Sequence, residues 1–270
     1  MMKKEIKIIS LIVVVLLVIF TLNDLSISNK LYNPESTFGW FFESFGELVL
    51  SFIGLFSAWV LFKTQKTKIV GMRIVYGILI IFNGLMAASL NKMYLNLSTV
   101  VMLVIMIIYI GIFYFLASLV KEKDEELVRK IAKIGILLSL LPILIITLLK
   151  MVWGRPRYRS MVDPAVEFTP WYLIQGFTTD NEFMSFPSGH SANSATIIWL
   201  TLLPLWLDKL KPYRHIITFG AYAWIGCVML SRVIMGAHFS TDVLIGSTIT
   251  ISLFYYLKNY YLKEELHSLN

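Results

Sequence analysis

The sequence has few of the residues that a water-soluble protein carries on its surface. Only 15% of its 270 residues are charged, whereas 57% are hydrophobic. A soluble domain has roughly a quarter charged residues, so this composition excludes an ordinary soluble globular protein. The single cysteine, Cys227, lies in an apolar run and has no partner in the chain, which excludes an intrachain disulfide. Structural repeats and low-complexity tracts are also lacking, so neither a solenoid nor a disordered linker is expected.

Long apolar runs are what the sequence does have. They recur at about twenty residues, the length that crosses a hydrocarbon core of ~30 Å. They predict an all-α, polytopic transmembrane helix bundle that forms a single integral membrane domain over residues 1–270. About eight spans are expected, near residues 6–22, 47–62, 70–90, 97–120, 131–149, 190–207, 215–235 and 241–257. The stretch FGWFFESFGELVLSF, which leads into the second span, carries Glu43 and Glu47, so this span could begin as an interfacial helix.

The basic residues indicate how the chain is oriented. The net charge is +7, but the Lys and Arg residues lie in short loops between apolar runs, which is typical of membrane topology and not of a nucleic-acid-binding face. An N-terminus in the cytoplasm assigns most of the 24 Lys and Arg residues to the inner side, and places both termini there. The compact chain favours a bacterial cell membrane. Seven cations then fall outside, and five of them need an explanation: Lys150, Arg155, Arg157, Arg159 and Arg232.

Three polar clusters emerge on the same membrane face. Residues 150–159 follow the fifth span, residues 187–190 precede the sixth, and residues 231–242 join the seventh to the eighth. Two crossings separate the last two clusters, so all three lie on the same face of the membrane whatever the number of earlier spans. Clusters far apart in the sequence are therefore expected to meet there.

The cations suit a phosphate group. Lys150, Arg157 and Arg232 can neutralise a dianion, and Arg guanidinium groups bind phosphate oxygens in a bidentate way. Ser188 and Gly189 lie where the sixth span starts, so their backbone N–H groups can face an anion from a helix N-terminus. The alternative is that these cations only extend from helix ends to lipid headgroups.

Two histidines and a carboxylate complete the cluster. His238 and Asp242 are four residues apart, which places them on one side if the segment is helical. The carboxylate could then fix the imidazole tautomer and leave the other nitrogen as a nucleophile, while His190 protonates the departing oxygen. Two histidines and a carboxylate could also ligate a catalytic zinc ion, but that alternative leaves the three cations unexplained.

Three motifs in this region resemble those of the type 2 phosphatidic acid phosphatase superfamily, to which vanadium haloperoxidases and glucose-6-phosphatase also belong. The first is KMVWGRPRY, which starts at Lys150 and has Arg157 in register; Tyr158 stands where the family has proline. The second is PSGH at residues 187–190, and the third is Ser-Arg, five residues, His, three residues, Asp at residues 231–242. A rival register takes the arginine from Arg155, but only Arg157 keeps the family's distance from Lys150.

The resemblance implies a fold, an activity and a set of roles. It implies a six-helix phosphatase-like core, with catalytic spans over residues 131–258 and N-terminal spans without a signature over residues 1–120. It implies a nucleophile, His238, oriented by Asp242, with His190 as the acid. It also implies no metal and no cofactor, and a phosphate cradle made of Lys150, Arg157, Ser188, Gly189 and Arg232.

The expected function is hydrolysis of a lipid phosphate or pyrophosphate at the outer face of the membrane, through a phosphohistidine intermediate. Phosphatidate, phosphatidylglycerol phosphate and undecaprenyl pyrophosphate are the candidate substrates. The expected partners are the lipid phosphate and membrane lipids, with no nucleic acid. Two alternatives use the same pocket: a phosphotransferase that passes the phosphoryl group to another lipid, and a non-catalytic lipid transporter or binding protein.

Overall fold

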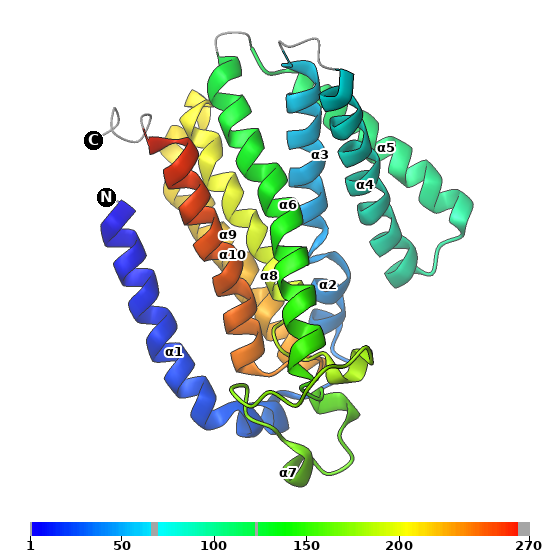
Figure 1. The fold of residues 1–270 in the computed structure, drawn as a ribbon, viewed down its shortest axis with the longest axis vertical. Helices are drawn as coiled ribbons and strands as arrows, with labels where there is room; N and C mark the ends of the chain where they lie inside the picture. Colours follow the sequence, from blue (N-terminus) through cyan, green and yellow to red (C-terminus); the bar gives the residue numbers. More distant parts are fainter. Residues whose placement is uncertain (1, 66–69, 122–123, 264–270) are drawn as a thin grey trace.

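The computed structural model describes residues 2–65, 70–121 and 124–263, and within these residues every regular element is helical. The helices stand side by side as one elongated bundle (Figure 1). Those that enter or border the bundle are α1 (Met2–Leu31), α2 (Thr37–Phe45), α3 (Leu48–Lys63), α4 (Val70–Leu95), α5 (Thr99–Ser118), α6 (Glu125–Trp153), α8 (Gly189–Ser194), α9 (Arg214–Ile234) and α10 (Ser240–Tyr261). Short pieces are α7 (Pro164–Glu167) and the 3₁₀ helices η2 (Tyr158–Ser160), η3 (Asn181–Phe183), η4 (Ala195–Leu205) and η5 (Asp208–Tyr213).

Six helical stretches of the described residues are long and apolar enough to cross a membrane: Glu5–Leu31, Thr37–Lys63, Val70–Leu95, Thr99–Ser118, Glu125–Ser160 and Asp208–Ile234. The expected spans near 190–207 and 241–257 are not among them. The first is divided between α8 and η4, so no single long helix forms, and the second is α10, which begins with polar residues. Both still run along the bundle beside α6 and α9 (Figure 1).

The bundle core is built from α3, α6, η4 and α10. The buried face of α6 carries Ile131, Ile134 and Leu138, and the Trp199 indole of η4 donates a hydrogen bond to the Ile131 carbonyl at 3.0 Å. Helices α1 and α5 instead expose apolar side chains along most of their length. Apolar side chains on the outer surface are what a lipid-facing helix requires, since a hydrocarbon surround is as apolar as Leu itself.

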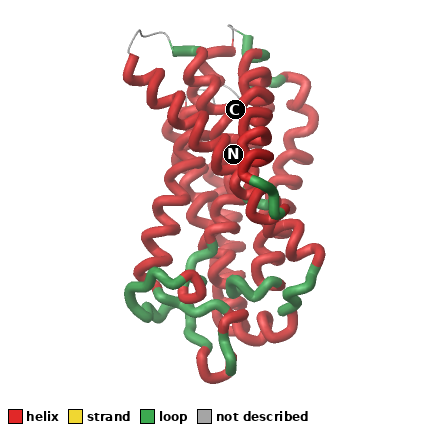
Figure 2. Tube along the Cα trace, turned by 90° about the vertical axis from the view of Figure 1, so that its right-hand side faces the viewer, coloured by secondary structure: helices red, strands yellow, loops and turns green. Residues whose placement is uncertain are grey.

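The segments that carry the three motifs lie at one end of the bundle. Helix α6 ends at Gly154, whose φ of +64° is the left-handed conformation that suits glycine, and a Cβ there would come within 2.5 Å of the Gly176 carbonyl oxygen. The long connection that follows covers this end (Figure 2). Helices α8 and α10 begin here and α9 ends here, whereas α10 ends toward the other end, near the start of α1 (Figure 1).

Candidate active site

The cations of the first motif come from the end of α6 and the connection after it. Lys150 is in the last turn of α6, and its Nζ donates to the Met184 carbonyl at 2.5 Å. Its Cε lies 3.6 Å from the position that a Cβ on Gly189 would occupy, so α6 and α8 meet here. Arg157 donates from Nε and Nη2 to the carbonyl and side-chain oxygens of Asn181, both at 2.8 Å. Its Nη1 has no hydrogen-bond partner among the residues that the structure describes.

The second motif forms the start of α8. Ser188 caps the helix: its hydroxyl oxygen accepts from the Ser191 N–H at 3.3 Å. The Ser188 N–H donates to the Asp242 carbonyl at 3.0 Å, so its hydroxyl proton is the group it can offer to a ligand. A Cβ on Gly246 would lie 2.4 Å from the Ser188 carbonyl oxygen, so only glycine lets α10 pack this closely against the corner. The second and third motifs are thus joined through the backbone.

His238 has one ring nitrogen held and one free. Its Nδ1 lies 2.6 Å from the Ser185 carbonyl oxygen, and His238 is only 2% exposed. A carbonyl oxygen can only accept, so Nδ1 carries the proton and Nε2 has its lone pair available. Lys150, Arg157 and Arg232 all lie within electrostatic range of this ring.

Asp242 does not hold His238 as the spacing predicted. Its Oδ2 accepts from the Ser185 hydroxyl at 2.6 Å and from the Phe239 N–H at 2.9 Å, and its Oδ1 accepts from Arg155 at 2.5 Å. The reason is that α10 begins only at Ser240, so His238 lies before the helix and a four-residue spacing does not place the two on one face. Asp242 instead caps α10 and acts on His238 through Ser185, which binds both.

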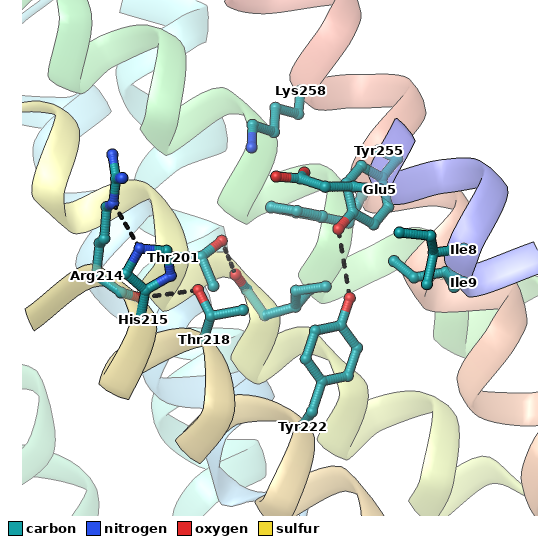
Figure 3. Close-up of a pocket in the computed structure, with 12 residues that line it drawn as sticks. Glu5, Ile8, Ile9, Thr201, Arg214, His215, Thr218, Tyr222, Tyr255 and Lys258 are labelled. Carbon is teal, nitrogen blue, oxygen red and sulfur yellow. Dashed lines mark hydrogen bonds between the residues drawn. The ribbon is translucent and has the colours of Figure 1, made fainter. Parts of the chain in front are cut away.

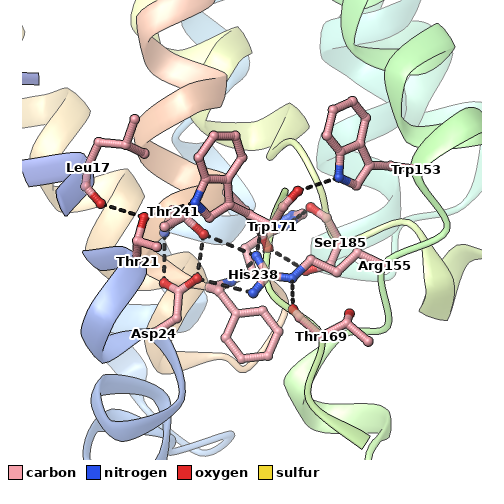
Figure 4. A network of polar contacts seen from close by, with 12 residues as sticks. Leu17, Thr21, Asp24, Trp153, Arg155, Thr169, Trp171, Ser185, His238 and Thr241 are labelled. Carbon is pink, nitrogen blue, oxygen red and sulfur yellow. Dashed lines mark hydrogen bonds and ion pairs between the residues drawn. The ribbon is translucent and has the colours of Figure 1, made fainter. Parts of the chain in front are cut away.

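Arg155 is the centre of a buried ionic network (Figure 4). The side chain is fully buried, and its guanidinium lies 3.1 Å from the Asp24 carboxylate of α1 and 2.5 Å from Asp242. It also donates to the Thr169 carbonyl and the Thr241 hydroxyl. Asp24 in turn accepts from the Thr241 N–H at 2.9 Å and from the Thr241 hydroxyl.

This network separates the two arginines of the first motif. Every nitrogen of Arg155 already has a protein partner, two of them carboxylates, so it has no donor left for a substrate. Arg157 has no partner for Nη1 among the described residues, and it lies within electrostatic range of His238. The geometry therefore leaves Arg157, and not Arg155, with a nitrogen available to a ligand.

His190 and Arg232 have acidic partners that the sequence analysis did not assign. The His190 Nε2 lies 3.3 Å from Glu47 and 3.1 Å from the Tyr94 hydroxyl. The Arg232 Nη1 lies 2.8 Å from Glu43. A carboxylate in an apolar run is expensive in a membrane and usually marks a functional site, which is the signal that could have identified Glu43, Glu47 and also Asp24. Tyr94 and Ser185 gave no such signal.

The connection between α6 and α8 is tied to α1 and is stabilised by an ion pair within itself. The Trp171 indole donates to the Thr21 hydroxyl of α1 at 2.9 Å. Arg159 forms a two-point pair with Glu182, and its hydrogen bonds hold the pKa of the Glu182 carboxyl below the ordinary value. Tyr172 and Phe177 are exposed, and aromatic side chains are enriched where a protein meets the membrane interface.

The described residues do not provide the ligand set of a zinc site. No group of three His, Cys, Asp or Glu side chains there is arranged to hold a metal ion. The His190 ring is directed to Glu47 and Tyr94, and the His238 ring to Ser185. The two histidines and Asp242 therefore do not form the ligand set that the alternative requires.

A separate cavity of about 340 Å³ lies toward the opposite end of the bundle, where α1 and α9 begin and α10 ends. Figure 3 shows the residues that line it. The cavity lies between α1, η4, α9 and α10, and its polar lining includes Glu5, Arg214, His215 and Lys258. The Tyr222 and Tyr255 hydroxyls are 3.3 Å apart at its edge. The three motifs contribute no residue to it.

Comparison with known proteins agrees with the motifs. The chain is 36% identical over 78 residues to phosphatidylglycerophosphatase B of Bacillus subtilis (strain 168), a match that covers 28% of this chain and 38% of that protein. No solved structure matches the chain closely enough for comparison. The sequence profile described as the PAP2 superfamily matches residues 131–265, which include all the motif residues. Since that match covers half of the 270-residue chain, the protein belongs to the PAP2 superfamily.

Proposed function

We propose that this integral membrane protein hydrolyses the terminal phosphate of a lipid phosphate, without a metal ion, through a phosphohistidine at His238. The observation that carries the proposal is the His238 ring, whose Nδ1 is held by Ser185 while Nε2 has no hydrogen-bond partner among the described residues, with three cations in electrostatic range of the ring. A neutral imidazole with one nitrogen fixed and one lone pair free is a competent nucleophile.

The first step transfers the phosphoryl group to the enzyme. Lys150, Arg157 and Arg232 bind the phosphate oxygens and offset the charge that develops on them. The lone pair of His238 Nε2 forms the N–P bond while the bond from phosphorus to the lipid oxygen breaks. His190 gives its proton to the departing oxygen, so the lipid leaves as an alcohol.

The second step returns the enzyme to its starting state. A water molecule loses a proton to His190 and attacks phosphorus, the N–P bond breaks, and inorganic phosphate leaves. Asp242 supports both steps indirectly, because it fixes Ser185, whose carbonyl holds the His238 ring. The Ser188 hydroxyl and the backbone at Gly189 are proposed as further phosphate contacts at the start of α8.

Substrate and membrane face are part of the proposal. The similarity to a phosphatidylglycerophosphatase makes phosphatidylglycerol phosphate the first substrate to test, followed by phosphatidate and undecaprenyl pyrophosphate. We place the site on the extracytoplasmic face of a bacterial cell membrane and both termini in the cytoplasm. The support is the cations Lys63, Lys121 and Arg214, which lie where α3, α6 and α9 meet the other end.

Two other uses of the pocket make different predictions. A lipid phosphotransferase would pass the phosphoryl group from His238 to a lipid alcohol, so purified enzyme would release little inorganic phosphate unless water replaced the acceptor. A lipid transporter or binding protein would move or bind its ligand with the phosphate intact.

The test is phosphate release by purified protein over a panel of lipid phosphates and pyrophosphates in detergent micelles. Phosphate release that is lost in His238→Ala, with the variant still monodisperse, supports the hydrolase. Lipid product without free phosphate favours the phosphotransferase. Normal turnover by His238→Ala rules out this histidine as the nucleophile.

A further inference from the structure

The surroundings of the acid, His190, come largely from outside the part of the chain that the family profile matches. Glu47 lies at the junction of α2 and α3, and Tyr94 lies near the end of α4, both before residue 131. Both approach the same ring nitrogen, Nε2, at 3.3 Å and 3.1 Å. The N-terminal spans, which have no motif of their own, thus supply groups to the site.

Glu47 is itself fixed in place. Its Oε2 accepts a hydrogen bond at 2.9 Å from Asn193, which lies one turn after His190 on the same helix. Glu47 is only 8% exposed, so water competes little for the hydrogen bonds of its carboxylate. Glu47, Asn193 and His190 therefore form a small closed set in which Oε1 is directed at the ring.

We propose that Glu47 is a positioning residue for His190, assisted by Tyr94, and that this selects which ring nitrogen delivers the proton. The inference rests on the proposed function. A carboxylate can only accept, so Nε2 keeps its proton on the Glu47 side throughout the cycle. Among the described residues, Nδ1 has no hydrogen-bond partner, so it is the nitrogen that exchanges a proton with the substrate.

The proton balance follows from this assignment. With both nitrogens protonated, His190 gives the Nδ1 proton to the leaving oxygen as the bond from phosphorus to oxygen breaks. The neutral ring, still held through Nε2–H, then takes a proton at Nδ1 from the attacking water. Glu47 stays ionised and stabilises the doubly protonated ring, as carboxylates do for imidazolium groups in hydrolytic sites.

If Glu47 had only a structural role, the loss of activity on its substitution would not depend on the leaving group of the substrate. The test uses this difference. An alkoxide leaving from a lipid needs a proton, whereas p-nitrophenolate leaves without one. Kinetics are measured with p-nitrophenyl phosphate and with phosphatidate or phosphatidylglycerol phosphate, whichever the wild type hydrolyses. The variants are Glu47→Gln, which keeps an acceptor for Asn193, and the control Glu35→Gln, an exposed carboxylate just before α2.

We expect Glu47→Gln to lower kcat on the lipid on the order of tenfold to a hundredfold, and to change kcat on p-nitrophenyl phosphate by less than about threefold. KM for the lipid should change little, and Glu35→Gln should match the wild type on both. An equal loss on both substrates, or no loss on the lipid, overturns the proposal.

A second variant covers the case in which Glu47→Gln does not fold. Tyr94→Phe removes one hydroxyl from the same nitrogen, and we expect the same selective loss at about fivefold, the effect of one hydrogen bond. An unselective loss in Tyr94→Phe then overturns the proposal. A wild type that releases phosphate from neither substrate contradicts the proposed function instead, so the two failures are distinct.

Discussion

Asp24→Ala is the substitution that most directly tests the buried network at the end of α1. It removes the carboxylate that accepts from Arg155 and from both donors of Thr241. Removing one partner of a buried ion pair costs ~3–5 kcal/mol, because the other charge stays buried without compensation. Since Arg155 keeps Asp242, we take the lower figure of ~3 kcal/mol, which lowers Tm by roughly 6–12 °C for a protein of this size.

The assay is thermal unfolding of the purified protein in detergent, followed by intrinsic fluorescence. Asn23→Ala is the matched control, because Asn23 is the exposed neighbour on α1 and bonds only to the Ile19 carbonyl of its own helix. Asp24→Asn should fall between the two, since it keeps an acceptor for the Thr241 N–H but loses the charge. If Asp24→Ala and Asn23→Ala melt within about 2 °C of each other, the network does not anchor α1, and the reasoning from the cost of an uncompensated buried charge is refuted.

Three further predictions concern the phosphate pocket. Gly189→Ala should fold, because its Cβ would lie at an ordinary contact distance of 3.6 Å from Lys150 Cε. It should nevertheless lose most activity, because the methyl group would occupy the space proposed for the phosphate. Full activity would mean that the phosphate binds elsewhere. Arg157→Gln should lower kcat/KM roughly 10- to 100-fold, the effect of one charge-assisted hydrogen bond. If Arg155→Gln instead lowered kcat by more than this while its Tm stayed unchanged, the roles of the two arginines would be reversed. Activity should survive EDTA and be blocked by vanadate, and a loss with EDTA that zinc restores would favour metal chemistry.

The sequence predicted where the motifs meet better than how their side chains pair. The face on which Lys150, the PSGH corner and His238 emerge depends only on how many crossings separate them, which the apolar runs give directly. Glu43 and Glu47 can be seen in the sequence as carboxylates in an apolar run. Their partners, Arg232 for Glu43 and His190 for Glu47, depend on how non-adjacent helices pack. Side-chain partners of that kind are set by tertiary packing, which spacing along one chain does not contain.

The pairing of Asp242 shows this limit most clearly. A four-residue spacing from His238 indicated a contact only if the helix had already begun, and α10 starts two residues later. The Asp242 carboxylate therefore accepts hydrogen bonds from the start of α10 and from Arg155. The Ser185 carbonyl, and not Asp242, binds His238 Nδ1. The position at which a helix begins, to within one or two residues, is the least certain part of any sequence-based prediction.

The most direct test of the central claim is to trap the covalent intermediate. The purified protein is mixed with a radiolabelled lipid phosphate, quenched within milliseconds in alkali and digested for mass spectrometry. The account predicts phosphate on the peptide that contains His238, stable to alkali and released by acid, and absent from His238→Ala. Label on another residue, or rapid turnover with no labelled protein at any time, would contradict it.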